Sequence, residues 1–292
     1  NRLAAYMINQ FADIQSMKQI GKTANVSGQT VARIFDHISY PKPRMPQVLS
    51  IDEFRGNAGD EKFQCILTDP KNRHVLDILP KRQSESLYSY FSGFDREERN
   101  QVGYVVMDMS SLFRGVIKRC FPRAHIIADR YHVVRQVTWA LDNVRKNEQK
   151  KFSKDRRLHF KHSRKILLKP SSRLTDDEKD QLTVMLQASP RIREAYLRKV
   201  EFEKVMDSNS SKEAGKRLSQ WISFTQNAQI PEFEKCCDTF IKWAKEITGS
   251  FDHPYTNGYT EGVNNKIKVI KRISFGVRDF ERFRNRILYA MA

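Results

Sequence analysis

The chain has 292 residues, and its 52 Lys and Arg against 34 Asp and Glu give a formal net charge of +18. Hydrophobic residues make up 39% and aromatic residues 11%, which is enough for a packed core and excludes a disordered basic tail. No apolar run approaches the roughly 18 residues of a membrane helix, so we expect a cytoplasmic protein with no membrane partner. The four cysteines lack CxxC spacing, which disfavours a zinc ribbon or a disulfide framework.

The positive charge points to a polyanionic partner, because Lys and Arg that neutralise phosphates release condensed counterions. The charge is concentrated in two stretches. Residues 133–170 hold 12 basic and 3 acidic residues, a net charge of +9, and residues 263–292 hold 8 basic and 2 acidic residues, a net charge of +6. Nucleic acid is therefore the expected partner, and a merely solvated basic surface is the alternative.

Residues 1–40 are expected to form an all-helical DNA-binding domain. Segment 20–34 has the pattern of a helix-turn-helix, with a small residue at Gly21 for close helix packing and a turn residue at Asn25. A plain helical hairpin is the alternative. The second helix would expose side chains able to bond phosphates or base edges, namely Ser27, Gln29, Thr30 and Arg33.

The next segment changes to strand periodicity after a Pro-rich linker over residues 41–47. Five β-rich runs and two helical patterns follow. Strands are expected at 48–54, 63–67, 75–79, 102–107 and 124–128, and helices at 84–94 and 112–120. The order β-β-β-α-β-α-β predicts a mixed sheet with helices, the first part of an α/β core over residues 48–132.

Helical signals then replace strand signals. Thr175 and Glu178 have the spacing of a capping box, which marks a helix N-terminus. We expect a large all-α insertion domain over residues 133–250, followed by a last helical part of the core over residues 251–292.

Three acidic residues have positions that suggest a metal site: Asp52 within the first strand, Asp108 at the end of the fourth strand, and Glu261 in the first turn of the helix after the insertion. Carboxylates that converge at a sheet edge bind hard cations. Two Mg²⁺ ions about 3.5–4 Å apart can activate an attacking oxygen and stabilise a leaving one at phosphorus. Solvated surface acids are the alternative, since the chain has 34 acids, but an unpaired carboxylate in the apolar strand of Asp52 would be costly.

The helix of Glu261 has two distinct faces at about 100° per residue. Val263, Ile267 and Ile270 lie on the side away from Glu261 and are expected to pack. The side of Glu261 carries residues that could contact a phosphate backbone, namely Asn264, Asn265, Lys268 and Arg272. Asp129 and His132 form a second, accessory constellation after the fifth strand, for which a structural hydrogen bond is the alternative.

These residues resemble the ISL-three group of bacterial insertion-sequence transposases, and the resemblance covers nearly the whole chain. It is carried by the blocks IGKTANVSGQTVARIF, SIDEF, VVMDMS, FPRAHIIADRYHVVRQV and NGYTEGVNNKIKVIKRISFGVRDFERFRNRIL. The resemblance implies a ribonuclease-H-like fold, with Asp52, Asp108 and Glu261 as the catalytic ligands of two Mg²⁺ ions that Mn²⁺ can replace. It also implies that Asp129 and His132 match an accessory Asp-x-x-His signature.

The chain departs from this group at its N-terminus. The group usually has a cysteine-rich, zinc-binding region before the helix-turn-helix, whereas this sequence starts at Asn1 and has no such cluster, so we expect a fragment. The choice of Asp108 and not Asp129 as the second catalytic acid depends on strand order.

We therefore expect a nucleoid-associated bacterial DNA transposase that binds the terminal inverted repeats of its element. It would cut the DNA and join the freed 3′ hydroxyl to target DNA, as a homodimer or larger assembly. One alternative is a metal-dependent nuclease with the same acids but no strand transfer, and the other is a non-catalytic DNA-binding descendant.

Overall fold

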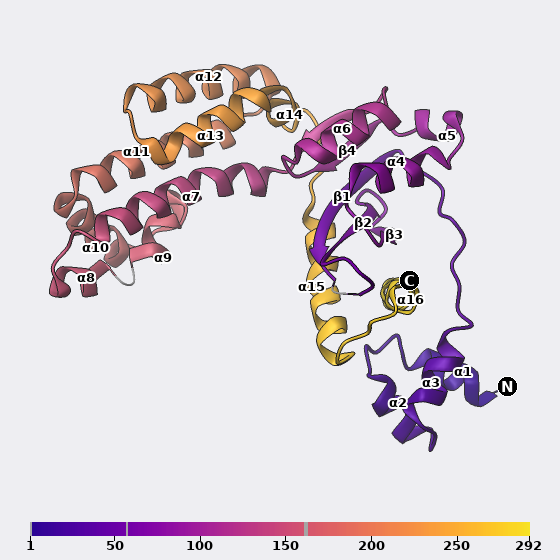
Figure 1. Ribbon diagram of the computed structural model, residues 1–292. Coiled ribbons are helices and arrows are strands. Elements are labelled where there is room, and N and C mark those ends of the chain that lie inside the picture. Colours follow the sequence, from indigo (N-terminus) through magenta and orange to yellow (C-terminus); the bar gives the residue numbers. More distant parts are fainter. Residues whose placement is uncertain (1, 57, 161–162) are drawn as a thin grey trace. The chain divides into compact units, whose positions relative to one another are not determined.

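The computed structural model describes residues 2–56, 58–160 and 163–292, and the chain forms two compact units (Figure 1). The first unit comprises the chain up to Ile127 together with Tyr255–Ala292, and the second comprises Ala128–Pro254. Within the described ranges, no helix has the length and apolarity that a membrane span requires.

The first unit begins with three short helices, α1 (Arg2–Asn9), α2 (Met17–Thr23) and α3 (Gly28–Phe35). The turn between α2 and α3 is tight. Asn25 is left-handed, with φ of 54°, and a Cβ on Gly21 would lie 2.7 Å from the carbonyl oxygen of Val26. The Ser27 hydroxyl accepts a hydrogen bond from the Thr30 N–H at 3.0 Å and thereby caps α3. The small residue, the turn residue and the cap thus have the roles that the pattern predicted.

Five strands form one mixed sheet in the order β3-β2-β1-β4-β5. They are β1 (Val48–Arg55), β2 (Phe63–Asp69), β3 (His74–Leu79), β4 (Tyr104–Met107) and β5 (His125–Ala128), which confirms the five expected strands. β1 is central, because it pairs antiparallel with β2 and parallel with β4, and β2 pairs antiparallel with β3. The structure therefore confirms the predicted class, a mixed sheet with helices.

Helices connect the later strands of the sheet. They are α4 (Ser84–Ser92), α5 (Arg96–Asn100) and α6 (Ser111–Cys120), of which the sequence predicted the first and the last. The rings of Phe91 and Phe121 join α4 to the end of α6, with centroids 4.9 Å apart. Residues 38–47, which include the predicted linker, contain neither helix nor strand.

The last two helices of the first unit are α15 (Gly258–Ile273) and α16 (Phe280–Met291), and both pack on the sheet (Figure 1). Val263, Ile267 and Ile270 of α15 are at most 4% exposed. They share a hydrophobic cluster with Phe54 and Ile66 of the strands. The predicted apolar face of α15 is therefore the packed face.

Helix α16 also anchors the three N-terminal helices. Arg282 forms a bidentate ion pair with Asp36, with N–O distances of 2.7 and 2.6 Å. The Arg286 side chain is 2% exposed, and its guanidinium donates hydrogen bonds to the carbonyl oxygens of Phe11, at 3.0 Å, and Gln15. Burial lowers the pKa of Arg286 to about 10. These polar contacts fix the N-terminal helices to the C-terminal helix.

From Arg130 onward, the regular elements among the described residues of the second unit are all helices, and the unit contains the predicted insertion segment 133–250. Its core includes Trp221, whose ring makes an edge contact with Phe202 and a tilted contact with Phe240, with ring centroids 4.9 and 5.6 Å away. The Thr175–Glu178 capping box is formed. The elements are α7 (Arg130–Gln149), α8 (Lys154–Phe160), α9 (Ser163–Leu168), the 3-10 helix η1 (Ser171–Arg173), α10 (Asp176–Ala188), α11 (Pro190–Met206), α12 (Ser211–Asn227), α13 (Pro231–Lys242) and α14 (Ala244–Gly249).

Candidate active site

Asp52 lies in the central strand β1 and is 8% exposed. Its Oδ1 accepts a hydrogen bond from the Glu53 N–H at 2.8 Å. Its Oδ2 accepts hydrogen bonds from the side-chain amides of Asn264, at 2.9 Å, and Asn257, at 3.5 Å. A buried carboxylate is costly unless its oxygens are bonded, so these two asparagines stabilise Asp52 in one orientation.

The register of β1 and β4 brings Asp108 close to Asp52. Ile51 and Met107 are partners in the parallel pair, and each of the two aspartates directly follows one of these partners. Neighbouring strands are about 4.8 Å apart, so the two acids leave adjacent strands at the same level. Asp108 is half-buried and follows the C-terminal end of β4, the edge where open α/β sheets bind ligands.

Glu261 lies in the first turn of α15, between the two asparagines that touch Asp52. Asn257, Glu261 and Asn264 are spaced i, i+4 and i+7, which places them on one stripe of the helix. The Glu261 N–H donates to the Asn257 carbonyl at 2.9 Å, so the first turn is regular. Because both flanking amides bond the Asp52 carboxylate, this stripe faces β1. The structure thus brings Glu261 to the side of the sheet where Asp52 lies.

A buried network of hydroxyl groups fixes the start of α15 against the sheet. The Thr260 hydroxyl lies 3.0 Å from the Ser50 hydroxyl of β1 and 2.8 Å from the Thr68 hydroxyl of β2. The Ser50 hydroxyl also donates to the Asn257 side-chain oxygen. Ser50, Thr68, Asn257 and Thr260 are each 0% exposed. Satisfied buried polar networks of this kind specify one arrangement, which here sets the position of Glu261.

The side chain of Asn264 has a further property that bears on metal binding. Its Nδ2 bonds Asp52, while its buried Oδ1 has no hydrogen-bond partner among the atoms of the described residues. Hard divalent cations take carboxylate, amide and water oxygens as ligands. The unbonded amide oxygen of Asn264 and the carboxylate of Asp52 beside it are ligands of the kind that such a cation takes, so these two residues fit a divalent metal ion.

Asp129 and His132 belong to the second unit, at the start of α7. Asp129 is 5% exposed, and its Oδ2 lies 2.8 Å from His132 Nδ1. Because a carboxylate oxygen accepts hydrogen bonds, His132 Nδ1 is the donor in this contact, and in a neutral ring the lone pair would then be on Nε2. This is the arrangement in which a carboxylate orients an imidazole for proton transfer or metal binding.

The other predicted contact residues lie on two surfaces of the first unit. On α3 and its cap, Ser27, Gln29 and Arg33 are exposed and Thr30 is half-buried. On α15, Asn265, Lys268 and Arg272 are exposed, and the Lys268 ammonium donates to Asn265 at 3.0 Å. Asn264 differs from this group, because it is 8% exposed and turned toward Asp52.

Sequence reasoning missed Asn257 and assigned Asn264 only a DNA contact. The available signal was their i, i+4, i+7 spacing with Glu261, because two amides flanking an acid on one stripe are suited to hold a second carboxylate. What the sequence could not supply was the partner, since Asp52 lies 205 and 212 positions away from the two asparagines.

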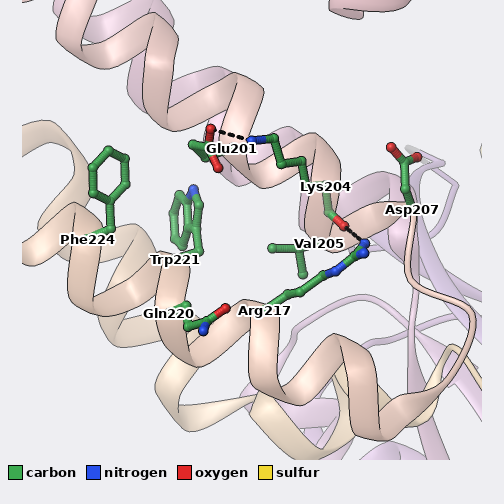
Figure 2. A pocket seen from close by; sticks show the side chains of 8 residues that line it. All are labelled: Glu201, Lys204, Val205, Asp207, Arg217, Gln220, Trp221 and Phe224. Atoms are coloured by element: carbon green, nitrogen blue, oxygen red, sulfur yellow. Dashed lines mark hydrogen bonds and ion pairs between the residues drawn. The ribbon is translucent and has the colours of Figure 1, made fainter.

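A pocket of about 650 Å³ in the second unit is a poor candidate for catalysis. Figure 2 shows that α11 and α12 line it, and three of the charged side chains drawn there make local contacts: Lys204 lies 2.7 Å from Glu201, and the Arg217 guanidinium donates to the Lys204 carbonyl oxygen. Trp221 at its base is 3% exposed and donates to the Arg198 carbonyl at 2.7 Å. These groups are occupied by structural contacts.

Comparison with known proteins gives a family for most of the chain. The ISL3 family model, described as "Transposase", matches residues 49–287. "Transposase for insertion sequence element IS1001" from Bordetella parapertussis is 26% identical over 288 residues, which cover 92% of this chain and 70% of the relative. "Transposase for insertion sequence element IS1557" from Mycobacterium tuberculosis is 25% identical over 240 residues, 74% of this chain and 54% of the relative. An "ATP-dependent protease" from Lactococcus lactis matches a shorter stretch, at 37% identity over 73 residues and 23% of this chain.

Proposed function

Because this chain belongs to the ISL3 family of transposases, we propose that it cuts and joins DNA strands at a centre formed by Asp52, Asp108 and Glu261. The observation that carries the proposal is the hydrogen bonding of Asp52 by Asn257 and Asn264, which flank Glu261 on α15. Asp108 joins the same centre through the β1–β4 register.

We propose a ribonuclease-H-like core for the first unit. The support is the strand order β3-β2-β1-β4-β5, in which three antiparallel strands are extended by a β4 parallel to β1. Two of the acids follow register partners of β1 and β4, and the third lies on a helix that packs on β1.

The three carboxylates would hold two Mg²⁺ ions, or Mn²⁺ in their place, which when bound supply Lewis-acid activation of a nucleophilic oxygen and neutralise charge at phosphorus. The chain's own residues provide positioning. The amides of Asn257 and Asn264 fix Asp52, and the hydroxyl network fixes α15 and with it Glu261. His132, oriented by Asp129, is proposed as an accessory group, since Asp129 directly follows β5 in the chain.

DNA binding is assigned to two surfaces of the first unit. The exposed side of α3 would contact the terminal inverted repeats through Ser27, Gln29, Thr30 and Arg33, and α15 would contact the backbone near the cut through Asn265, Lys268 and Arg272. Asn264 would act next to Asp52. Since transposition joins two ends, the functional assembly is proposed to be a homodimer or a larger oligomer.

The test is strand cleavage and joining on a labelled duplex that carries the element's end, with Mg²⁺ or Mn²⁺. We expect Asp52→Asn, Asp108→Asn and Glu261→Gln each to reduce both products more than about a hundredfold, since even residues behind metal ligands contribute about 10- to 100-fold. Glu53→Gln is the matched control, because Glu53 is the next acid on β1 and pairs with Arg82 at 2.6 Å.

Other results would support other conclusions about the function. Cleavage without joining by the parent chain indicates a nuclease. Tight DNA binding without chemistry indicates a DNA-binding descendant. If Asp129→Asn abolishes both products and Asp108→Asn does not, Asp129 is the second acid and the present assignment is wrong.

A further inference from the structure

Phe275, in the loop between α15 and α16, is 89% exposed, whereas Val184, the next most exposed large apolar side chain among the described residues, is 66% exposed. A ring that stays in water does not gain the favourable free energy of burial, and the fold itself does not require this exposure. Aromatic side chains presented in this way commonly mark a binding surface.

The backbone at Phe275 is also in an unusual conformation. α15 ends at Ile273 with Ser274 as its C-cap, and Phe275 follows with φ of 49°, the left-handed position that glycine normally occupies after a helix. A bulky residue there is strained, and strain of this kind is concentrated at functional sites.

A second left-handed apolar residue provides a comparison. Ile14 has φ of 54°, but it is partly buried and packs against the hydrophobic cluster of the sheet, α15 and α16. Packing therefore maintains the conformation of Ile14. Phe275 has almost no burial that could do the same.

The surroundings of Phe275 are basic. From Gly262 to Arg278 the chain has five basic residues and no acidic one, and Arg272 and Arg278 on either side of the loop are exposed. The loop forms one wall of a pocket of about 380 Å³ whose opposite wall is segment 15–18 at the start of α2. The loop thus lies next to α2, which packs against the proposed DNA-binding helix α3.

We propose that Phe275 stacks on an unstacked base of the bound DNA, while Arg272 and Arg278 hold the neighbouring phosphates. This inference depends on the proposed DNA-processing function. Basic grooves combined with exposed aromatic rings are the general means by which proteins bind unpaired bases. A second copy of this chain is the less suitable occupant, because the same basic stretch, residues 262–278, would face itself.

The test uses the whole chain and two duplexes, one fully paired and one with a single unpaired 2-aminopurine, whose fluorescence falls when it stacks. For the parent we expect quenching and tighter binding of the second duplex. Phe275→Leu should lose the quenching and bind that duplex about 5- to 150-fold more weakly, because stacking of one base contributes about 1–3 kcal/mol to binding. Phe275→Trp should retain both properties. Ile241→Ala, which shortens an exposed apolar side chain of the second unit, is the control.

Folding effects are separated by Phe275→Gly, which relieves the backbone strain and removes the ring. Its Tm is expected to equal or exceed that of the parent while its binding falls as in Phe275→Leu. A lower Tm would show that the ring supports the fold and would overturn the inference.

The remaining outcomes are distinct. If Phe275→Leu binds and quenches like the parent, the stacking role is wrong and the proposed function stands. If the Phe275 variants change only self-association in sedimentation, the surface is a protein interface. If the parent binds neither duplex, the proposed function and this inference fail together.

Discussion

Replacing Asn264 by aspartate tests the geometry of the centre most directly. The substitution removes the hydrogen bond of 2.9 Å to Asp52 and puts a second carboxylate in its place. Two unit charges about 4 Å apart repel by about 4 kcal/mol at an effective dielectric constant of 20. Keeping the introduced carboxyl protonated at pH 7 costs about as much, because its ordinary pKa is about 3.9.

The first unit of Asn264→Asp should therefore be destabilised by about 4 kcal/mol at neutral pH without metal. This corresponds to a fall in Tm of about 8–16 °C for a unit of this size. The folded-state pKa of the introduced carboxyl is raised above its unfolded value, so the penalty is absent below the unfolded pKa and grows as pH rises through the folded pKa. At pH 5 most of the loss should disappear, because the protonated carboxyl can donate to Asp52 as the amide does.

The Tm loss and its dependence on pH and metal are measured by thermal unfolding. The parent, Asn264→Asp and Asn265→Asp are each compared at pH 5 and pH 7.5, with and without Mg²⁺. Asn265→Asp is the matched control, because it adds the same charge at the next position on an exposed side chain. Mg²⁺ should restore the Tm of Asn264→Asp more than that of the control. Equal Tm losses in the two variants, or a loss that neither low pH nor Mg²⁺ relieves, would refute the geometry.

Three further predictions concern the N-terminal helices. Arg286→Met removes the guanidinium that bonds the Phe11 and Gln15 carbonyls and should lower the free energy of unfolding by about 2–4 kcal/mol in urea titrations. Gly21→Ala should cost about 1–3 kcal/mol and weaken DNA binding in a fluorescence titration, because the new Cβ would lie 2.7 Å from the Val26 oxygen. Gly28→Ala is its control, because a Cβ there would lie 3.5 Å or more from its neighbours. The hydrogen bond and charge of Arg282 lower the pKa of Asp36, so the pair stabilises the fold at neutral pH and loses this effect as pH falls through the folded pKa. Asp36→Asn should remove that part of the acid dependence, less than about 1 kcal/mol because the pair is partly exposed, in unfolding curves from pH 2 to 6.

Local patterns allowed much of the first unit to be predicted. The strands were recognisable because β-rich apolar runs end at turn residues, and the faces of α15 were recognisable because Val263, Ile267 and Ile270 repeat at helical spacing. The α2–α3 turn was recognisable because Gly21 and Asn25 meet local steric demands. Each of these features depends on residues close together in the chain.

Long-range polar contacts could not be predicted in the same way. In the sequence, Arg286 is one of eight basic residues in segment 263–292, whose net charge is +6. In the structure it is 2% exposed, and its guanidinium donates hydrogen bonds to main-chain carbonyls about 270 positions away. Nothing in the sequence near Arg286 encodes a partner that is a backbone oxygen. The same holds for the amides of Asn257 and Asn264, whose spacing gives a common face but not the residue that the face meets.

The hydrogen bonds that anchor α15 bear on how the proposed site can form from acids that the second unit separates in the sequence. Apolar packing of Val263 and Ile267 would tolerate small shifts of the helix along β1, because dispersion contacts are not directional. The hydrogen bonds between Thr260, Ser50 and Thr68 do not tolerate such shifts, since a shift of one residue would leave buried hydroxyls unbonded. The proposed site therefore depends on a polar contact within an apolar interface, and that contact sets the position of α15, and with it Glu261, along β1.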